Sequence, residues 1–210
     1  MKRGAQIVVF GALLLACLVS WRGAARALVL GNPSPDFKKG NFGVGAALSD
    51  DRETLFVDVG LSDAGTLEVL AGNLDVPAGR SGTELGVGYR HKLGASFNLG
   101  KFPTHLGILA GYRVASVDTP VGSLDFNLID IGFGGSITPV QNLNTFAAAI
   151  YERVKADTVL PILGKLSKTE SNLGFLLGAE YWITPAFVVG GEVHPGLDDD
   201  SLAFYGTFKF

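Results

Sequence analysis

The sequence predicts an all-β protein, a closed antiparallel up-and-down barrel that crosses a membrane. Beyond residue 40 the chain alternates apolar and polar residues with a period of two, and helical patterning is scarce. Several alternating segments run for 10 to 14 residues, whereas strands of globular proteins usually have about 5–6 residues and a membrane-spanning strand needs about 9–11. One face of the alternation is apolar, and the other combines glycine with charge, as expected for the interior of a narrow barrel.

The amino terminus predicts a secretory signal peptide. Lys2 and Arg3 form a basic start, Ile7–Val19 is an apolar run of 13 residues, and Ala25–Ala27 fits the small-x-small cleavage rule. We therefore divide the chain into a signal peptide (1–27), a short segment before the barrel (28–40) and the barrel itself (41–210). A lipoprotein signal remains open as an alternative, because the residues before Cys17 resemble a lipobox.

Charge and cysteine content exclude some function classes. Of the 17 basic residues, four lie in the predicted signal, which leaves 13 against 20 acidic residues and a net charge of −7. This balance argues against nucleic acid as a partner. The single cysteine lies in the signal, so the exported chain needs no disulfide.

Turn residues divide the alternating region into ten predicted strands. Their ranges are Asn41–Asp50, Thr54–Asp63, Thr66–Val76, Thr83–Leu93, Thr104–Val117, Asp125–Thr138, Asn144–Asp157, Asn172–Thr184, Ala186–Gly196 and Ser201–Phe210. The pattern predicts long connections over Gly94–Pro103 and Thr158–Ser171. A closure of eight strands, with one early hairpin left out, remains an alternative.

The apolar face is expected to meet lipid, and its aromatic residues gather toward one end of the strands. They are Phe42, Tyr89, Phe133, Phe146, Tyr181, Phe187, Phe208 and Phe210, and they predict one of the two aromatic girdles of a membrane barrel. Tyr112 is the best candidate for the other girdle. Two residues fit poorly, because Phe56 falls on the interior face and Glu152 on the lipid face.

The opposite face predicts a charge network inside the barrel. Its members are Asp58, Glu68, Glu84, Arg90, Lys92, Arg113, Asp130, Arg153, Lys155, Glu180, Glu192 and Lys209. Acids and bases crowded into a narrow interior are expected to pair, because an isolated desolvated charge is costly. A filled interior argues against a wide diffusion pore.

The last strand carries the most specific pattern. Phe210, Phe208, Gly206 and Tyr205 form an aromatic ending in which glycine stands one residue closer to the first aromatic than usual. The chain from residue 28 onward resembles the small outer-membrane β-barrel proteins of Gram-negative bacteria. The resemblance implies export by the general secretory route and a place in the outer membrane, with residues 28–40 in the periplasm. It also implies contact with outer-membrane lipid and lipopolysaccharide, recognition of the last strand by the barrel-assembly machinery, and a monomer.

The leading functional prediction is a structural or interaction role exercised through the outer loops. A narrow porin-like channel for small solutes is the alternative, and an enzyme acting on outer-membrane lipid is a third. His194, Glu192 and Ser201 are weak candidates for a hydrolytic group. We expect no enzymatic activity, no cofactor and no metal, and we interpret the acidic residues 198–200 as a turn.

Overall fold

The computed structural model describes residues 31–35, 37–49, 52–76, 80–119, 122–160, 164–196 and 202–210. The predicted signal peptide with its cleavage site, Cys17, Ser201 and the acidic turn at 198–200 lie outside these ranges. In the described ranges no helix is long and apolar enough to cross a membrane.

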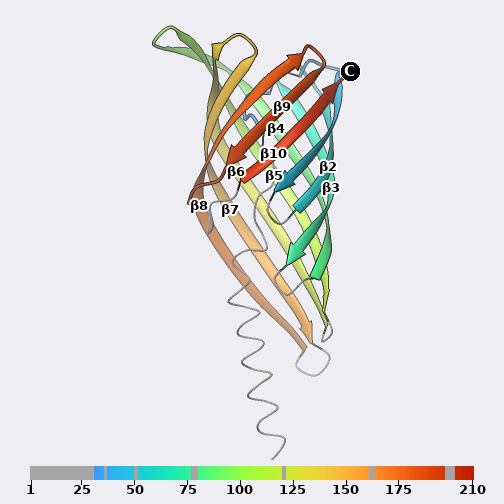
Figure 1. Cartoon of the computed structure of the whole chain (residues 1–210). Helices are drawn as coiled ribbons and strands as arrows, with labels where there is room; N and C mark the ends of the chain where they lie inside the picture. Colours follow the sequence, from blue (N-terminus) through green and yellow to red (C-terminus); the bar gives the residue numbers. More distant parts are fainter. Residues whose placement is uncertain are drawn as a thin grey trace, which may run out of the picture.

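Ten strands form the described structure (Figure 1). They are β1 (Phe42–Ser49), β2 (Arg52–Gly60), β3 (Gly65–Val76), β4 (Arg80–Leu99), β5 (Phe102–Thr119), β6 (Gly122–Val140), β7 (Leu143–Leu160), β8 (Gly164–Thr184), β9 (Phe187–Val193) and β10 (Leu202–Lys209). Each overlaps one predicted strand, so the predicted order of elements is confirmed.

The strands close into an antiparallel barrel in which each strand pairs with its neighbours in sequence. β1 completes the ring by pairing with both β2 and β10, with Gly43 opposite Asp58 on one side and Lys209 on the other. The closed ring gives every strand two hydrogen-bonded neighbours, as a barrel in lipid requires. The ten-strand prediction is therefore confirmed, and the eight-strand alternative is wrong.

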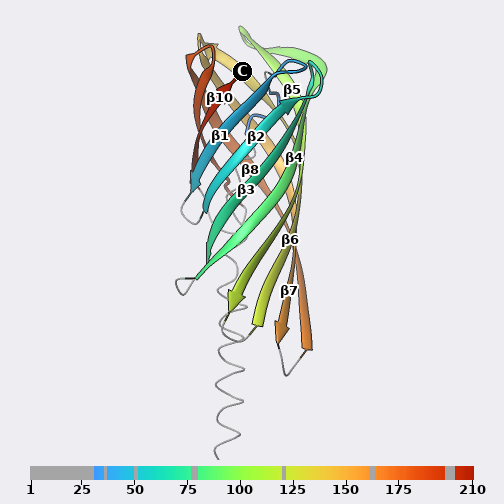
Figure 2. The ribbon, with the colours of Figure 1, turned by 90° about the vertical axis from the view of Figure 1, so that its right-hand side faces the viewer.

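The strands differ in length around the barrel, so its two ends differ in shape. We call the end where Phe42 and Phe210 meet the proximal end and the opposite one the distal end. β1, β2, β9 and β10 have 7 to 9 residues, whereas β4 to β8 have 18 to 21. The distal parts of β5 to β8 consequently project beyond the rest of the barrel (Figures 1 and 2).

Two predicted connections are mostly strand. β7 continues to Leu160 and β8 begins at Gly164, so nearly all of the predicted loop Thr158–Ser171 is a paired hairpin. The predicted connection Gly94–Pro103 continues β4 and β5 beyond a bulge between Lys92 and Ser96. Both segments were predicted as loops because neither shows the apolar alternation of the other strands.

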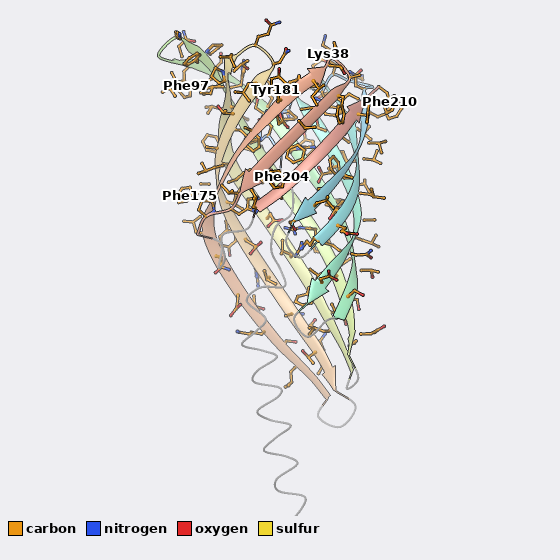
Figure 3. All side chains as sticks on the ribbon, viewed as in Figure 1. Lys38, Phe97, Phe175, Tyr181, Phe204 and Phe210 are labelled. Atoms are coloured by element: carbon orange, nitrogen blue, oxygen red, sulfur yellow. The ribbon has the colours of Figure 1, made fainter. Side chains whose placement is uncertain are left out.

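The outward face is apolar on every strand. It includes Val44, Leu55, Val69, Leu85, Ile108, Ile131, Tyr151, Phe175, Val193 and Phe204, one from each strand, each more than a third exposed. Phe175 and Phe210 project away from the barrel axis (Figure 3). A continuous exposed belt of this kind would be unfavourable in water and is the face that a membrane-spanning barrel presents to lipid.

Aromatic rings line the proximal end of this belt. Phe42 stacks on Phe210 at 5.0 Å between ring centroids, and Phe187 stacks on Phe208 at 4.4 Å. Backbone hydrogen bonds join Phe42 and Phe210 in both directions. The last aromatic residue therefore completes both the ring of strands and the proximal girdle.

The phase of β7 is the opposite of the predicted one. Phe146 and Glu152 are buried inside the barrel, at 4% and 5% exposure, while Arg153 and Lys155 are exposed on the outside. Both faces of this strand carry apolar residues, so the sequence alone assigned the wrong one, and a slip of one residue exchanges all side chains between the faces. The lumen assignments of Arg153 and Lys155 and the girdle assignment of Phe146 are therefore wrong.

Candidate functional site: the barrel interior

Glycines make space for the aromatic rings of the interior. A Cβ on Gly45 would lie 2.3 Å from the Phe56 ring, and a Cβ on Gly178 would lie 2.3 Å from the Phe146 ring. These rings join Leu70, Leu109, Ile150, Leu176, Ala47, Ala148, Ala203 and Tyr205 in one buried apolar cluster. Much of the lumen is thus packed like the core of a soluble domain.

A second apolar cluster lies toward the distal ends of four strands. It consists of Leu74 of β3, Val117 of β5, Phe126 of β6 and Ala156 of β7, all buried. Each lies within four residues of the distal end of its strand. This cluster lines the distal mouth with apolar side chains.

Four strands contribute to a buried ion-pair chain. Glu84 of β4 accepts hydrogen bonds from Arg52 of β2 at 3.0 Å and from Arg113 of β5 at 3.4 Å. Arg113 also donates to Asp130 of β6 at 2.5 Å. All four side chains are at most 4% exposed, so each charge depends on its partners in place of water.

A second ion-pair group lies on β2, β3 and β4. Asp58 and Glu68 stand opposite each other in the β2–β3 register. Arg90 donates one hydrogen bond to Asp58 and another, of 3.2 Å, to Glu68. The guanidinium group thereby holds together two carboxylates that would otherwise repel each other.

The segment before β1 lies inside the barrel. Residues 31–35 and Phe37 are buried. The Gly31 N–H donates to Glu192 at 3.0 Å, and the Asn32 amide donates to Glu180 at 3.3 Å. This part of the segment 28–40, which is predicted to lie in the periplasm, is thus enclosed by the barrel.

The wall is shaped to receive this segment. A Cβ on Gly107 would lie 1.9 Å from the Pro33 carbonyl oxygen, and a Cβ on Gly43 would lie 3.0 Å from the Phe37 ring. The ammonium group of Lys209 lies 4.3 Å from the centre of the Phe37 ring and 3.8 Å from that of Trp182. The segment has no charged residue from Gly31 to Pro35, so it satisfies interior carboxylates with backbone and amide donors and adds no further charge.

Two of the three hydrolytic candidates, His194 and Glu192, lie in the described residues and contact each other. His194 Nε2 lies 3.0 Å from Glu192 Oε1, and both side chains are at most 2% exposed. The other oxygen of Glu192 accepts the Gly31 N–H. With the carboxylate bonded on both oxygens and the imidazole enclosed, this arrangement is the geometry of a structural contact.

Other predicted site residues lie at the proximal end. Glu180 accepts a 3.0 Å hydrogen bond from the Tyr205 hydroxyl, which points inward, while Lys92 and Lys209 are half-buried. Gly206 packs near Phe187. The recognition of Tyr205, Gly206, Phe208 and Phe210 by assembly machinery stays a prediction.

Two interior charges were not in the predicted network. Arg52 lies in the turn predicted between the strands Asn41–Asp50 and Thr54–Asp63, because the charged residues at 50–53 are typical of a loop. Glu152 was assigned to lipid through the phase error on β7, although it stands opposite Asp130 in the β6–β7 register. The signal that could have found it is the charge itself, because a carboxylate facing lipid is unfavourable.

A small cavity borders the second ion-pair group and the N-terminal segment. A cavity of about 20 Å³ lies between the N-terminal segment and the wall, bordered by Asn32, Phe37, Asp58, Arg90 and Tyr205. That volume admits about one water molecule. Over the described ranges, no three His, Cys, Asp or Glu side chains are arranged to hold a metal ion.

Comparisons with known proteins find similarity of structure only. No protein-family model matches the chain, and no characterised protein matches it in sequence. The attachment invasion locus protein Ail of Yersinia pestis is similar over 82% of this chain and 99% of its own, with a TM-score of 0.41 and 11% identity. The translocator domain of the autotransporter NalP from Neisseria meningitidis is similar over 100% of this chain and 98% of its own, with a TM-score of 0.41 and 14% identity. The N-terminal β-barrel domain of Pseudomonas aeruginosa OprF is similar over 81% of this chain and 96% of its own, with a TM-score of 0.33 and 11% identity.

All three are β-barrels, and at these values the similarity extends to no specific function. The fold rests on the closed ring of ten strands, and the membrane environment rests on the apolar belt. The chain is a membrane-spanning β-barrel.

Proposed function

We propose that the protein is a non-conducting barrel of the bacterial outer membrane that anchors and displays its projecting distal strands. The observation that carries the proposal is the filled interior. Two apolar clusters, two ion-pair groups and the segment from Gly31 to Phe37 occupy it. Among the described residues the interior is therefore lined by packed apolar groups and paired charges, which differs from the open polar lumen of a porin.

The orientation follows from the two ends. Periplasmic turns of such barrels are short and the extracellular side is longer. The proximal turns at Gly100–Lys101 and Gln141–Asn142 are tight, although the β4–β5 hairpin is extended there. The distal end carries the larger extension, which is formed by β5 to β8. We therefore place the proximal end in the periplasm and the distal end outside the cell.

The displayed element is the β7–β8 hairpin. β8 has 21 residues, about twice the number needed to cross a membrane. Beyond Leu173 its outward face changes from apolar residues to Ser171, Thr169 and Ser167. A paired and polar hairpin standing outside the bilayer supports an interaction role.

Single-channel recording in planar bilayers tests the closed state. The purified wild-type barrel is expected to give no steady open steps. A channel function would instead give steady steps whose size or ion selectivity changes when Arg113 and Asp130 are neutralised, and that result would overturn the proposal.

A further inference from the structure

Three cationic side chains lie on the outside of the β7–β8 hairpin. Arg153 and Lys155 alternate with the inward Glu152 and Ala156 on β7, and Lys165 lies on β8 opposite Val159. All three are exposed. Charges on the outer surface of a membrane barrel are tolerated only near the interfaces.

Arg153 and Lys155 stand where the apolar belt ends. Tyr151, two residues before Arg153, is outward and 44% exposed, and its hydroxyl donates to Ser171 at 3.1 Å. On β5, the outward Tyr112 donates to Asn127 at 2.9 Å. Tyrosines with the ring in the belt and the hydroxyl on a polar group mark the membrane interface.

The cross-strand register places Arg153 and Lys155 directly beyond that boundary, and Lys165, farther along the hairpin, is joined to Lys155 through Asp157. Arg153 lies between Ile129 of β6 and Ser171 of β8, neither of which is charged. Lys155, the next outward residue, lies between Asn127 and Thr169. The outer surface therefore changes from apolar to cationic within four residues of β7.

The local carboxylates do not neutralise the three cations. Asp157 is shared, 3.2 Å from Lys155 and 2.9 Å from Lys165. Asp125 stands opposite Asp157 on β6 and accepts a hydrogen bond from Ser116. The lysine side chains remain 49% and 57% exposed, against 8% for Asp157, so their ammonium groups can still bind an external anion.

We infer that Arg153, Lys155 and Lys165 bind the phosphate groups of a phosphorylated glycolipid in the outer leaflet. At the edge of the hydrocarbon layer the available anions are lipid phosphates. Arginine contacts a phosphate through two parallel N–H donors, and lysine contributes a mobile point charge. The inference rests on the proposed function, because it requires the distal end to face the outside of the cell.

The experiment measures lipid binding by native mass spectrometry of the full exported chain in a non-ionic detergent. Diphosphoryl lipid A is the probe. Replacing Arg153, Lys155 and Lys165 together by glutamine should raise its Kd at least tenfold. The matched control replaces three exposed cations of the proximal end, Lys38, Lys39 and Lys101, by glutamine, and its Kd should equal that of the wild type.

A second variant changes binding in the opposite direction. Asp157→Asn removes the carboxylate shared by Lys155 and Lys165 and should lower the Kd severalfold. Lipid A stripped of its phosphates should bind the wild type as weakly as diphosphoryl lipid A binds the triple variant. Heat-modifiable migration on gels verifies that every variant forms a barrel.

Three results would overturn the inference: an unchanged Kd in the triple variant, equal binding of dephosphorylated lipid A, or displacement of lipid A by an equal concentration of phosphatidylglycerol. The last would assign the site to phospholipid phosphate. An open pore in bilayer recordings would refute the closed barrel and leave the binding result intact, so the two proposals fail separately.

Discussion

Single glycines determine where the large interior side chains can lie. Gly45, Gly178 and Gly190 each face an aromatic ring, with 2.3 Å between the position of an added Cβ and the nearest ring atom. A barrel wall with side chains at these positions would exclude Phe56, Phe146 and Tyr205. Each of these rings can therefore pack against the wall only because a glycine faces it.

Gly45→Ala should destabilise the barrel by about 1–3 kcal/mol through overpacking against Phe56. The free energy of unfolding, measured by urea titration in detergent micelles, tests this. Gly94→Ala is the matched control, because a Cβ there meets no atom within 4 Å. The added variant Phe56→Leu should recover part of the loss in the double mutant, and strictly additive effects would contradict the contact.

Asp157 lies beyond the apolar belt and is expected to titrate at low pH. A hydrogen bond from Ser167, with those from Lys165 and Lys155, lowers the pKa of its carboxyl from 3.8 to about 2. Because the pKa is depressed in the folded state, these contacts stabilise the hairpin fully above about pH 4, and the stabilisation is lost as the pH falls through 2.

NMR titration of the Asp157 side-chain carbon in micelles measures this midpoint. Ser167→Ala should raise the midpoint toward 3.8, because it removes the largest contribution. A wild-type midpoint near 3.8 would show that the contacts around Asp157 do not form.

Among the strands, β7 shows how far period-two patterning can be trusted. β8 alternates Leu173, Phe175 and Leu177 with small or inward residues, and its predicted phase is that of the structure. In β7 the outward face has two alanines where other strands have large apolar residues, and the inward face has Phe146 and Ile150. Local pattern favours the wrong face, and only packing against Gly178 of the next strand resolves it.

Cysteine labelling distinguishes the two phases of β7. In a chain with Cys17→Ser, Arg153→Cys is expected to react readily with a water-soluble maleimide. Glu152→Cys should react at least about tenfold more slowly, because a buried thiol reacts only when the structure opens. The reverse order of rates would restore the predicted phase.

The projecting hairpins could not be predicted for a different reason. Residues 164–169 of β8 and 94–99 of β4 are exposed on both faces of the strand. Without a difference in environment there is no selection for alternation, so these strands resemble loops in sequence. Strand existence within the membrane was predictable because lipid imposes one apolar face.

At the scale of the whole molecule, the N-terminal segment (31–35 and Phe37) occupies part of the barrel interior. Gly31 and Asn32 bond to Glu192 and Glu180 from inside, while Lys38 reaches Gly60 at the proximal rim. Residues 31–35 have neither an apolar alternation nor a charge that would place them inside the barrel. The position of this segment depends on wall glycines such as Gly107, which lies 74 residues after Pro33 in the chain, and a local sequence pattern cannot connect the two.

Gly107→Ala should displace this segment from the interior, because a Cβ there would lie 1.9 Å from the Pro33 carbonyl oxygen. Ser34→Cys, in the Cys17→Ser chain, reports the position of the segment. The thiol should be protected from a water-soluble maleimide in the parent barrel and become reactive when Gly107→Ala is added. Gly88→Ala is the matched control, because its nearest contact would be an ordinary 3.5 Å.

The same pair of variants connects the segment to the closed state. If the segment occludes the proximal half of the lumen, Gly107→Ala should increase the frequency of brief openings in planar bilayers relative to Gly88→Ala. The distal apolar cluster around Leu74 and Phe126 remains in place, so the openings should stay short and small. If Ser34→Cys is labelled without any change in conductance, the ion pairs and apolar clusters close the barrel without the segment. The segment would then serve only to satisfy hydrogen-bonding groups of the wall.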